Sequence, residues 1–304
     1  MMITFAFCTY KRADRLERLV EAMRAQHCPE PFEILAVNNN SPDATLDVLR
    51  ALASLPGPRL RYVTETEQGI VPARNRVIAE AIDSDILVFI DDDELPLPGL
   101  LDAATDAVRA GARCVGGRIR VDLTTCRRPA WLGDELLGFL GQVDYGDTAF
   151  WLDDELRPVF TGNIAYDMTL FRDDASLRFD HRYNRRGAVL GGGEDLMMLR
   201  TLLSRSVPVR YCPEMAVLHA VEPWRLRRRY FLGIHYRSGL QSGRFELPHY
   251  RRQFLGVPPF MLAQVARQAW KTVATGLSGR PGLLRQAMNV AHAWGSIVGY
   301  AQRA

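Results

Sequence analysis

From residue 3 to residue 120, the sequence alternates between short apolar segments and longer segments with helical spacing of apolar residues. The strand-like segments are Ile3 to Thr9, Phe32 to Val37, Arg59 to Val63 and Ile86 to Ile90. Helical patterns occupy residues 13–26, 46–52, 69–82 and 100–109. This alternation predicts an α/β fold, in which helices cover both faces of a Rossmann-like, mostly parallel central sheet.

Four consecutive carboxylates, Asp91 to Glu94, follow the apolar run Leu87 to Ile90. Adjacent acidic side chains repel one another and are costly to place at the end of a buried strand unless a cation or water neutralises them. A divalent metal is one such cation. The alternative is an acidic surface turn that begins a helix with Pro96 in its first turn, which explains the acidic residues but not the apolar run.

Polar residues directly follow three of the predicted strands, at Thr9 to Arg12, Asn38 to Asn40 and Asp91 to Asp93. Because ligands bind beyond the carboxyl ends of strands in such sheets, we expect all three segments to face one crevice. Their chemistry suits a nucleotide diphosphate with its metal. The chain has neither the GxGxxG fingerprint nor the P-loop lysine motif, which argues against dinucleotide binding and ordinary ATPase chemistry.

A second acidic motif, Gly191-Gly192-Gly193-Glu194-Asp195, precedes apolar residues with helical spacing. The glycines allow the backbone to pass close to a ligand, and the carboxylates would lie at a helix N-terminus. The alternative interpretation is an ordinary glycine-rich turn with acidic capping residues.

Together these motifs resemble those of inverting glycosyltransferases of family two with the GT-A fold. The similarity is greatest to bacterial exopolysaccharide glucosyltransferases of the succinoglycan type and spans residues 3 to 240. It depends on six segments in order: CTYKR (Cys8–Arg12), VNNNS (Val37–Ser41), ARN (Ala73–Asn75), FIDDDELP (Phe89–Pro96), TGN (Thr161–Asn163) and GGGED (Gly191–Asp195).

The resemblance implies a role for each acidic residue. Asp91 to Asp93 correspond to the Asp-x-Asp motif, so Asp93 would bind Mn²⁺ or Mg²⁺, and Asp91 would contact the ribose or a metal-bound water. Asp92, between them, belongs to the same donor-binding segment. His219 follows a strand-like stretch and would be a further metal or phosphate ligand, although a lone histidine is more often structural. Asp195 would be the general base, with Glu194 beside it holding the acceptor or sharing the proton.

The resemblance also implies a nucleoside pocket. Thr9, Tyr10 and Arg12 would line it, and Arg74 would lie near the base or the diphosphate. Asn38 departs from the family pattern, which has an aspartate that accepts the uracil N3 proton. An amide oxygen can still accept that proton, so a UDP-sugar remains the favoured donor, with a less certain base preference.

The implied activity is metal-dependent, inverting transfer of a sugar from a nucleotide-diphosphate donor to a hydroxyl of a glycan, a glycolipid or another acceptor. A positioned carboxylate takes the acceptor proton, and a metal stabilises the departing diphosphate. One alternative is a metal-dependent phosphoryl or nucleotidyl transferase, which would need more carboxylates or a phosphate-binding lysine; Lys11 is the only lysine in the α/β region. The other is a catalytically silent binding module.

The C-terminal region is basic and apolar. Four arginines lie within Trp224 to Tyr230, and amphipathic helices are expected at Phe260 to Leu277 and Leu283 to Val298. We expect a GT-A catalytic domain at 1–222, with a nucleotide-binding half (1–120) and an acceptor half (121–222), and a helical extension at 223–304. Residues 224–304 either pack on the catalytic domain or contact an anionic membrane. No DNA- or RNA-binding motif accompanies the arginines, so no nucleic-acid partner is expected.

The five cysteines are odd in number and widely spaced, without a CxxC pair, which is typical of reduced thiols in a cytosolic protein. The first residues are predicted to form a strand and not a signal peptide. We therefore expect a cytoplasmic enzyme that either stays in solution or binds peripherally to the inner face of the plasma membrane.

Overall fold

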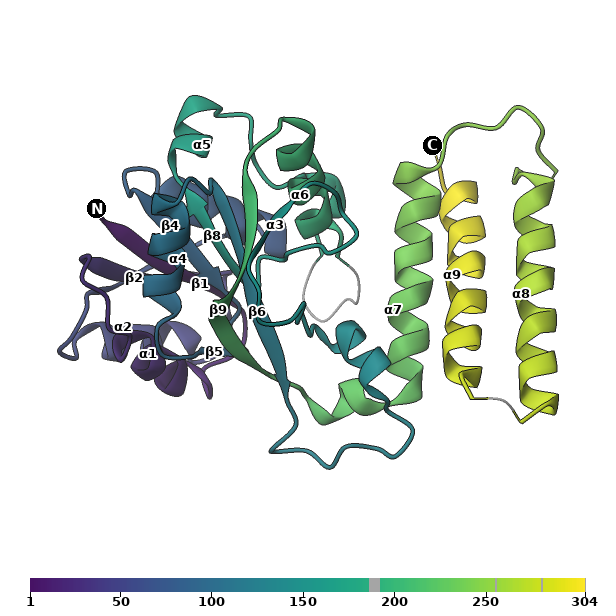
Figure 1. Cartoon of the computed structure of the whole chain (residues 1–304), viewed down its shortest axis with the longest axis horizontal. Coiled ribbons are helices and arrows are strands. Elements are labelled where there is room, and N and C mark those ends of the chain that lie inside the picture. Colours follow the sequence, from purple (N-terminus) through teal and green to yellow (C-terminus); the bar gives the residue numbers. More distant parts are fainter. Residues whose placement is uncertain (186–191, 255, 280, 304) are drawn as a thin grey trace. The chain divides into compact units, whose positions relative to one another are not determined.

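The computed structural model describes residues 1–185, 192–254, 256–279 and 281–303 (Figure 1). Gly191 of the second acidic motif lies outside the described residues. The chain divides into two compact units. The N-terminal unit is built from residues 1–185 and 194–221, and the C-terminal unit mainly from residues 222–303. The functional division expected from the sequence, with its boundary after residue 222, stays a prediction.

The described part of the N-terminal unit contains one sheet with the strand order β3-β2-β1-β4-β8-β6-β9-β5, and β7 pairs with β9. Strands β1 to β4 are parallel to one another, as the sequence predicted. β8 is antiparallel to both β4 and β6, whereas β6 and β9 are parallel. The strands are β1 (Ile3–Thr9), β2 (Phe32–Asn38), β3 (Leu60–Thr64), β4 (Ile86–Ile90), β5 (Glu94–Pro96), β6 (Cys114–Asp122), β7 (Phe150–Leu152), β8 (Asn163–Asp167) and β9 (Val209–Ala220).

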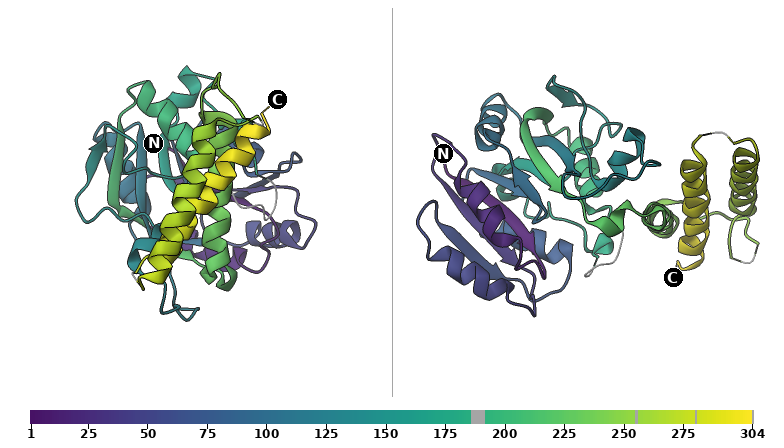
Figure 2. Two further views of the ribbon diagram at one scale, coloured as in Figure 1. Left: turned by 90° about the vertical axis from the view of Figure 1, so that its right-hand side faces the viewer. Right: turned by 90° about the horizontal axis from the view of Figure 1, so that it is seen from below.

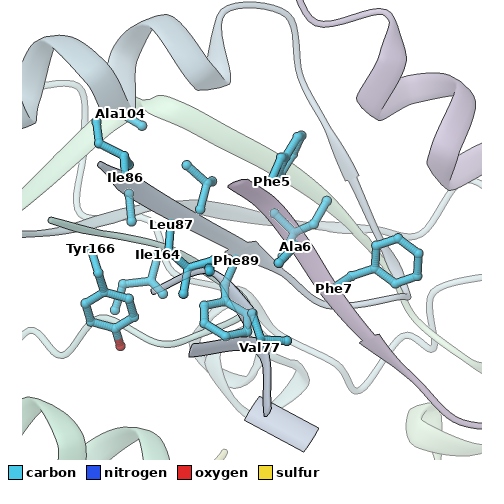
Figure 3. Packing of buried hydrophobic residues seen from close by; sticks show 14 of the residues in the cluster. Phe5, Ala6, Phe7, Val77, Ile86, Leu87, Phe89, Ala104, Ile164 and Tyr166 are labelled. Carbon is cyan, nitrogen blue, oxygen red and sulfur yellow. The ribbon is translucent and has the colours of Figure 1, made fainter. Parts of the chain in front are cut away.

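Helices flank this sheet (Figure 1). The α-helices are α1 (Leu16–Arg24), α2 (Thr45–Ala53), α3 (Ile70–Glu80), α4 (Leu100–Arg109), α5 (Thr169–Asp173) and α6 (Glu194–Ser204), and 3₁₀ turns occur at Asp134–Leu140 and His181–Tyr183. Figure 3 shows Val77 of α3 beside Phe89 and Ala104 of α4 beside Ile86, so β4 has packing partners on both faces. This double burial explains why every residue of β4 is apolar.

Two local expectations differ from the structure. Pro96 does not begin a helix: it ends the short strand β5, which pairs with β9, and α4 starts only at Leu100. The alternative interpretation of Asp91 to Glu94, as an acidic turn that begins a helix with Pro96 in its first turn, is therefore wrong about that helix. His219 lies within β9 and not after a strand, because β9 extends to Ala220 and pairs His219 with Glu94.

The C-terminal unit contains a 3₁₀ turn (Pro223–Leu226) and three α-helices among its described residues, α7 (Arg228–Gln241), α8 (Pro259–Leu277) and α9 (Leu283–Ala301). A π-helical turn, Ser242–Glu246, extends α7. The helices expected at 260–277 and 283–298 are thus confirmed. α9 packs against α7 on one side and α8 on the other (Figure 2). Within the described residues, no helix has both the length and the hydropathy that crossing a bilayer requires.

Glycines bring α7 and α9 into close contact. A methyl group added at Gly239 would lie 2.0 Å from the carbonyl oxygen of His292, and one added at Gly295 would lie 2.1 Å from that of Tyr236. Gly243 and Gly299, one turn further along each helix, are equally crowded by the opposite backbone. Any larger side chain at these positions would push the two helices apart.

Candidate active site

The sheet register brings the polar segments after β1, β2 and β4 to one edge. Thr9 is the residue of β1 opposite Asn38 at the end of β2. β4 runs parallel to β1 and ends at Ile90, so Asp91 leaves the sheet at the same edge. The three segments therefore lie at the same edge of the sheet, where the sequence predicts a ligand-binding crevice.

A single guanidinium links the two acidic motifs. Arg74 of α3 has a side chain that is only 2% exposed. Its Nη1 lies 2.6 Å from Asp195 Oδ1 and 3.1 Å from Glu194 Oε1, and its Nη2 lies 3.4 Å from Asp91 Oδ1. The acid run after β4 and the acid pair that starts α6 are thus neighbours, although about a hundred residues separate them in the sequence.

Charge pairing explains how Arg74 tolerates burial. Loss of water alone would lower the pKa of this guanidinium, but the charges of Asp195, Asp91 and Glu194 outweigh that effect and raise its pKa. A buried cation with several carboxylate partners is stable as a group, and removing one partner leaves uncompensated charge. Arg74 is therefore the residue on which the arrangement of the three carboxylates depends.

Neighbours of Arg74 in α3 fix the position of that helix. The side-chain amide of Asn75 donates to the carbonyl of Phe179 over 3.0 Å and accepts from its N–H over 2.9 Å. Asn184 accepts a hydrogen bond from the N–H of Val71 over 3.3 Å, in the first turn of α3. Gly69 precedes the helix with φ of 138° and has no space for a side chain beside Asn184. Sequence analysis gave no role to Asn75, although it follows Arg74 directly.

The two carboxylates that start α6 differ in access. Asp195 has a side chain that is 19% exposed, and its Oδ1 also accepts a hydrogen bond from the hydroxyl of Thr161. Glu194 is only 1% exposed, and its Oε2 has no hydrogen-bond partner among the residues that the structure describes. Burial and the charge of Asp195 raise the pKa of Glu194. Of the two, Asp195 is therefore the more accessible carboxylate.

Each residue of the TGN segment has a distinct contact. Thr161 orients Asp195, as described above. Gly162 passes so close to Glu94 that an added methyl group would lie 2.9 Å from Oε1 of that side chain. Asn163 donates from its amide to the carbonyls of Arg118 and Met215 over 3.0 and 2.8 Å, at the bulge where β6 pairs with β9. The segment thus links the sheet to the carboxylate cluster.

The acid run combines exposed and buried carboxylates. Glu94 is buried, accepts a hydrogen bond from the N–H of Asp91 over 2.9 Å, and has a pKa raised mainly by burial. Desolvation and the neighbouring charge of Asp93 raise the pKa of Asp92 to about 7, although Arg12 Nε lies 3.9 Å from its Oδ1. Asp93 Oδ2 lies 3.6 Å from Nε2 of His219. This concentration of negative charge makes the crevice attractive to cations.

These residues suit a divalent cation that a bound diphosphate also ligates. Among the described residues, no three His, Cys, Asp or Glu side chains are grouped closely enough to hold a metal ion alone. Asp93 and His219 nevertheless offer an oxygen and a nitrogen close together, and Asp91 is partly exposed. Mg²⁺ sites commonly use one or two carboxylates together with substrate phosphates, and Mn²⁺ also accepts oxygen ligands. The donor set therefore fits either ion.

Hydrogen bonds hold the segments after β1 and β2 together. The N–H of Lys11 donates to the hydroxyl of Ser41 over 3.1 Å, and Tyr10 and Arg12 on either side of Lys11 are half-buried. The amide oxygen of Asn38 accepts from the N–H of Ser41 over 3.1 Å and retains a second lone pair, in a residue that is 1% exposed.

Asn39, the middle residue of the segment after β2, connects these loops to the start of α3. Its amide donates to the carbonyl of Glu67 over 2.7 Å, and its amide oxygen accepts from the N–H of Gly69 over 2.8 Å.

The family model for glycosyl transferase family 2 matches residues 4–173, more than half of the chain. The chain belongs to glycosyltransferase family 2. Membership in this family gives no support to the phosphoryl- or nucleotidyl-transferase alternative. The matched residues include the segments after β1, β2 and β4, together with Arg74 and Thr161, whereas Glu194 and Asp195 lie beyond them.

Two curated glycosyltransferases match parts of this family 2 chain. Glycosyltransferase AglE of Haloferax volcanii is 27% identical over 112 residues, which are 36% of each protein. The uncharacterized glycosyltransferase YfnE of Bacillus subtilis is 30% identical over 92 residues, 30% of this chain and 23% of that protein. The chain therefore matches about a third of the first relative's length and less than a quarter of the second's.

Solved glycosyltransferases share the fold over nearly the whole chain. The mannosyltransferase PcManGT from Pyrobaculum calidifontis, in complex with GDP-Man and Mn²⁺, has a TM-score of 0.61 at 15% identity and covers 99% of this chain and 87% of its own. Residues 1–349 of TarS from S. aureus, in complex with UDP-GlcNAc, have a TM-score of 0.58 at 16% identity, with 98% and 90% covered. The family 2 chain thus has a GT-A-like fold.

Proposed function

We propose that this protein transfers a sugar from a nucleotide-diphosphate donor to an acceptor hydroxyl, in one metal-dependent step that inverts the anomeric configuration. The observation that carries the proposal is the position of Arg74, whose guanidinium contacts both Asp91 and Asp195. The donor-binding acids and the candidate base thereby lie on either side of one side chain. A sugar bound beside Asp91 would be within reach of an acceptor held at Asp195.

In this proposal Asp195 is the general base. Its carboxylate is the accessible member of the acid pair, and hydrogen bonds from Arg74 and Thr161 hold it in a defined orientation. A base oriented in this way takes the proton of the acceptor hydroxyl as that oxygen attacks the anomeric carbon. Attack from the face opposite the nucleotide would invert the configuration. Glu194, being buried, would act as a positioning residue that keeps Arg74 in place.

Asp91, Asp93 and His219 would hold Mn²⁺ or Mg²⁺. When bound, the cation neutralises the charge that develops on the departing diphosphate. Two of the similar structures contain Mn²⁺ together with a nucleotide or nucleotide sugar, which supports this assignment. Asp92 and Arg12 would complete the charged wall of the donor site.

A UDP-sugar is the proposed donor. Tyr10, Thr9 and Asn38 would surround the base, and Asn38 retains a lone pair that can accept the uracil N3 proton. One similar structure contains UDP-GlcNAc and another contains GDP-Man. The proposed preference for uracil therefore depends on this chain's own residues. The particular similarity of this chain to succinoglycan-type glucosyltransferases also remains a proposal.

The proposed acceptor is a hydroxyl of a glycan, a glycolipid or a small molecule, in the cytoplasm or at the inner face of the plasma membrane. All five cysteines carry free thiols, which supports a reducing compartment. Contact between residues 224–304 and a membrane would give the enzyme access to a lipid-linked acceptor.

Thermal unfolding with UDP, GDP, dTDP and ATP, each with and without Mn²⁺, tests the donor assignment. At about a hundred times the dissociation constant, a ligand adds about 2.7 kcal/mol of stability, which raises the melting temperature of a chain of this size by about 4 °C. We expect UDP with Mn²⁺ to give the largest increase, and EDTA to abolish it. If no nucleoside diphosphate raises the melting temperature with metal present, the proposal is wrong.

Asp93→Ala should remove the metal-dependent part of this increase. The matched control is Asp106→Ala, which removes an exposed aspartate that pairs with Arg109 on the surface of α4. The control should behave as the wild type does.

A further inference from the structure

We propose that the outer face of α8 binds the surface of an anionic lipid bilayer. This inference rests on the C-terminal unit alone and does not depend on the proposed function. The outer face consists of the residues of α8 that point away from α9: Ala263, Ala266, Trp270, Ala274 and Leu277.

α8 packs on its neighbour through the opposite face. Met261 is buried in a small cluster with Ile297 and Tyr300 of α9, and Val265 contacts the same cluster. One further turn along, the amide of Gln286 in α9 donates to Oε1 of Gln268 over 2.7 Å. Residues 261, 265 and 268 lie on one side of a helix with 3.6 residues per turn. The inner face is thus assigned by its contacts.

The outer face is apolar and exposed. Trp270 is 72% exposed and Leu277 is 85% exposed, and the three alanines between and before them are also exposed. Val273 and Leu262 extend the apolar surface along one edge, and both are exposed. Soluble monomers rarely expose large contiguous apolar patches, and such patches usually mark interaction sites.

The charges around this face have one sign. From Leu247 to the last residue, the sequence has seven Lys or Arg residues and no Asp or Glu. Arg267 and Lys271 lie along the edge of the outer face opposite Val273, as helical periodicity requires. Arg251 and Arg252, which precede α8, are exposed. A partner that covers the face would therefore meet apolar side chains flanked by positive charge.

An anionic bilayer matches both features of this face: its acyl chains suit the apolar side chains, and its headgroups suit the positive charges. Amphipathic helices with aromatic residues on one face and basic residues beside it lie in the headgroup region, with their apolar side chains among the acyl chains. Trp is favoured at this depth, and each nearby Lys or Arg attracts anionic lipid. A second copy of the chain is a poorer partner, because it would bring the same positive charges against each other. A nucleic acid would match the charges but not the apolar stripe.

Co-sedimentation of the full chain with vesicles tests the inference. We expect binding to phosphatidylcholine vesicles that contain 30 mol% phosphatidylglycerol, weak binding to pure phosphatidylcholine, and weaker binding in high salt. Since one basic residue near the surface contributes about fivefold in affinity, neutralising Arg267 and Lys271 together (Arg267→Gln, Lys271→Gln) should weaken binding by about 25-fold. Leu277→Glu should weaken it by about tenfold or more.

The matched control is Leu156→Glu, which changes a leucine of similar exposure, 83%, in the N-terminal unit. It should bind vesicles as the wild type does. Melting temperatures of all variants should equal that of the wild type, since the altered side chains are exposed. A variant that melts early is replaced by Trp270→Gln, for which the same loss of binding is expected.

Four results would overturn the inference. The first is undiminished vesicle binding by Leu277→Glu. The second is equal binding to neutral and anionic vesicles. The third is a dimer in sedimentation velocity that Leu277→Glu converts to a monomer, because a second copy would then be the occupant of the face. Binding of the chain to single-stranded RNA in place of vesicles would likewise assign the basic edge to another partner.

Discussion

The two units of this chain differ in their charge composition and in the kinds of side chain that they bury and expose. Residues 1–221 contain 25 Lys or Arg and 33 Asp or Glu, whereas residues 222–304 contain thirteen and two. The N-terminal unit buries charged groups such as Arg74 and Glu194 and pairs them with one another. The C-terminal unit exposes apolar groups such as Trp270 and Leu277. In our proposals, the buried charges belong to the site of the chemistry, and the exposed apolar groups belong to the surface that binds a bilayer.

Replacing Asp195 by Asn should produce the largest effect, which is a loss of turnover. It should leave the properties of the C-terminal unit unchanged. The amide can still accept the hydrogen bonds from Arg74 and Thr161, but it cannot take a proton. We expect turnover to fall by about 10²–10⁴-fold, the usual contribution of a positioned base. Stabilisation by UDP with Mn²⁺ and binding to anionic vesicles should both be retained. Undiminished turnover would exclude Asp195 as the base.

A change at the glycine contact between α7 and α9 should affect only the C-terminal unit. Gly295→Ala places a methyl group 2.1 Å from the carbonyl oxygen of Tyr236, so the helices must separate, at a cost of about 1–3 kcal/mol. We expect earlier unfolding and weaker vesicle binding, with UDP stabilisation unchanged.

The matched control for Gly295→Ala is Gly276→Ala in α8, where the added methyl group would lie 3.7 Å from Leu283 and meet no backbone. This change should be neutral or stabilise the protein by about 0.5–1 kcal/mol. If both variants unfold alike, the close contact contributes nothing specific to stability.

The smallest effect concerns the pH dependence of stability. The pKa of Glu194 is raised in the folded protein, so the folded state binds this proton more tightly than the unfolded state does. Ionisation of Glu194 therefore lowers the free energy of unfolding as the pH rises from the unfolded pKa through the folded one. Glu194→Gln removes this titration. The stability of the variant relative to the wild type should be greater at pH 8 than at pH 4, as measured by urea unfolding.

Glu155→Gln serves as the control of opposite sign. Hydrogen bonds from Arg200 hold the pKa of the exposed Glu155 carboxyl below its ordinary value, so Glu155 contributes stability at neutral pH that is lost as the pH falls through that window. Its substitution should therefore cost slightly more at pH 8 than at pH 4. The same trend for both variants would contradict the explanation for Glu194.

The regular elements could be predicted where the local pattern was strong. β1, β4 and α4 have the bounds expected from the sequence, because uninterrupted apolar runs and clear helical periodicity leave few alternatives. Placement of Thr9, Asn38 and Asp91 at one edge followed from the parallel sheet alone. These features depend only on the local sequence and on the general tendency of α/β sheets to bind ligands at the carboxyl ends of their strands.

The contacts that organise the site could not be predicted in this way. Arg74 contacts Asp195 across 121 residues of sequence, and Asn75 contacts Phe179 across 104. Neither spacing has a periodicity that a sequence pattern would reveal. β5 was also missed, since a three-residue strand is defined by its partner β9 and not by its own composition.

The bridging position of Arg74 has a consequence for how the two halves of the crevice influence each other. Because one guanidinium interacts with both Asp91 and Asp195, whatever alters the charge at the first alters the free energy of the second, and by reciprocity the converse effect has the same size. In the proposed reaction, a cation bound at Asp91 would therefore change the electrostatic potential at Asp195, and this coupling would need no movement of the backbone.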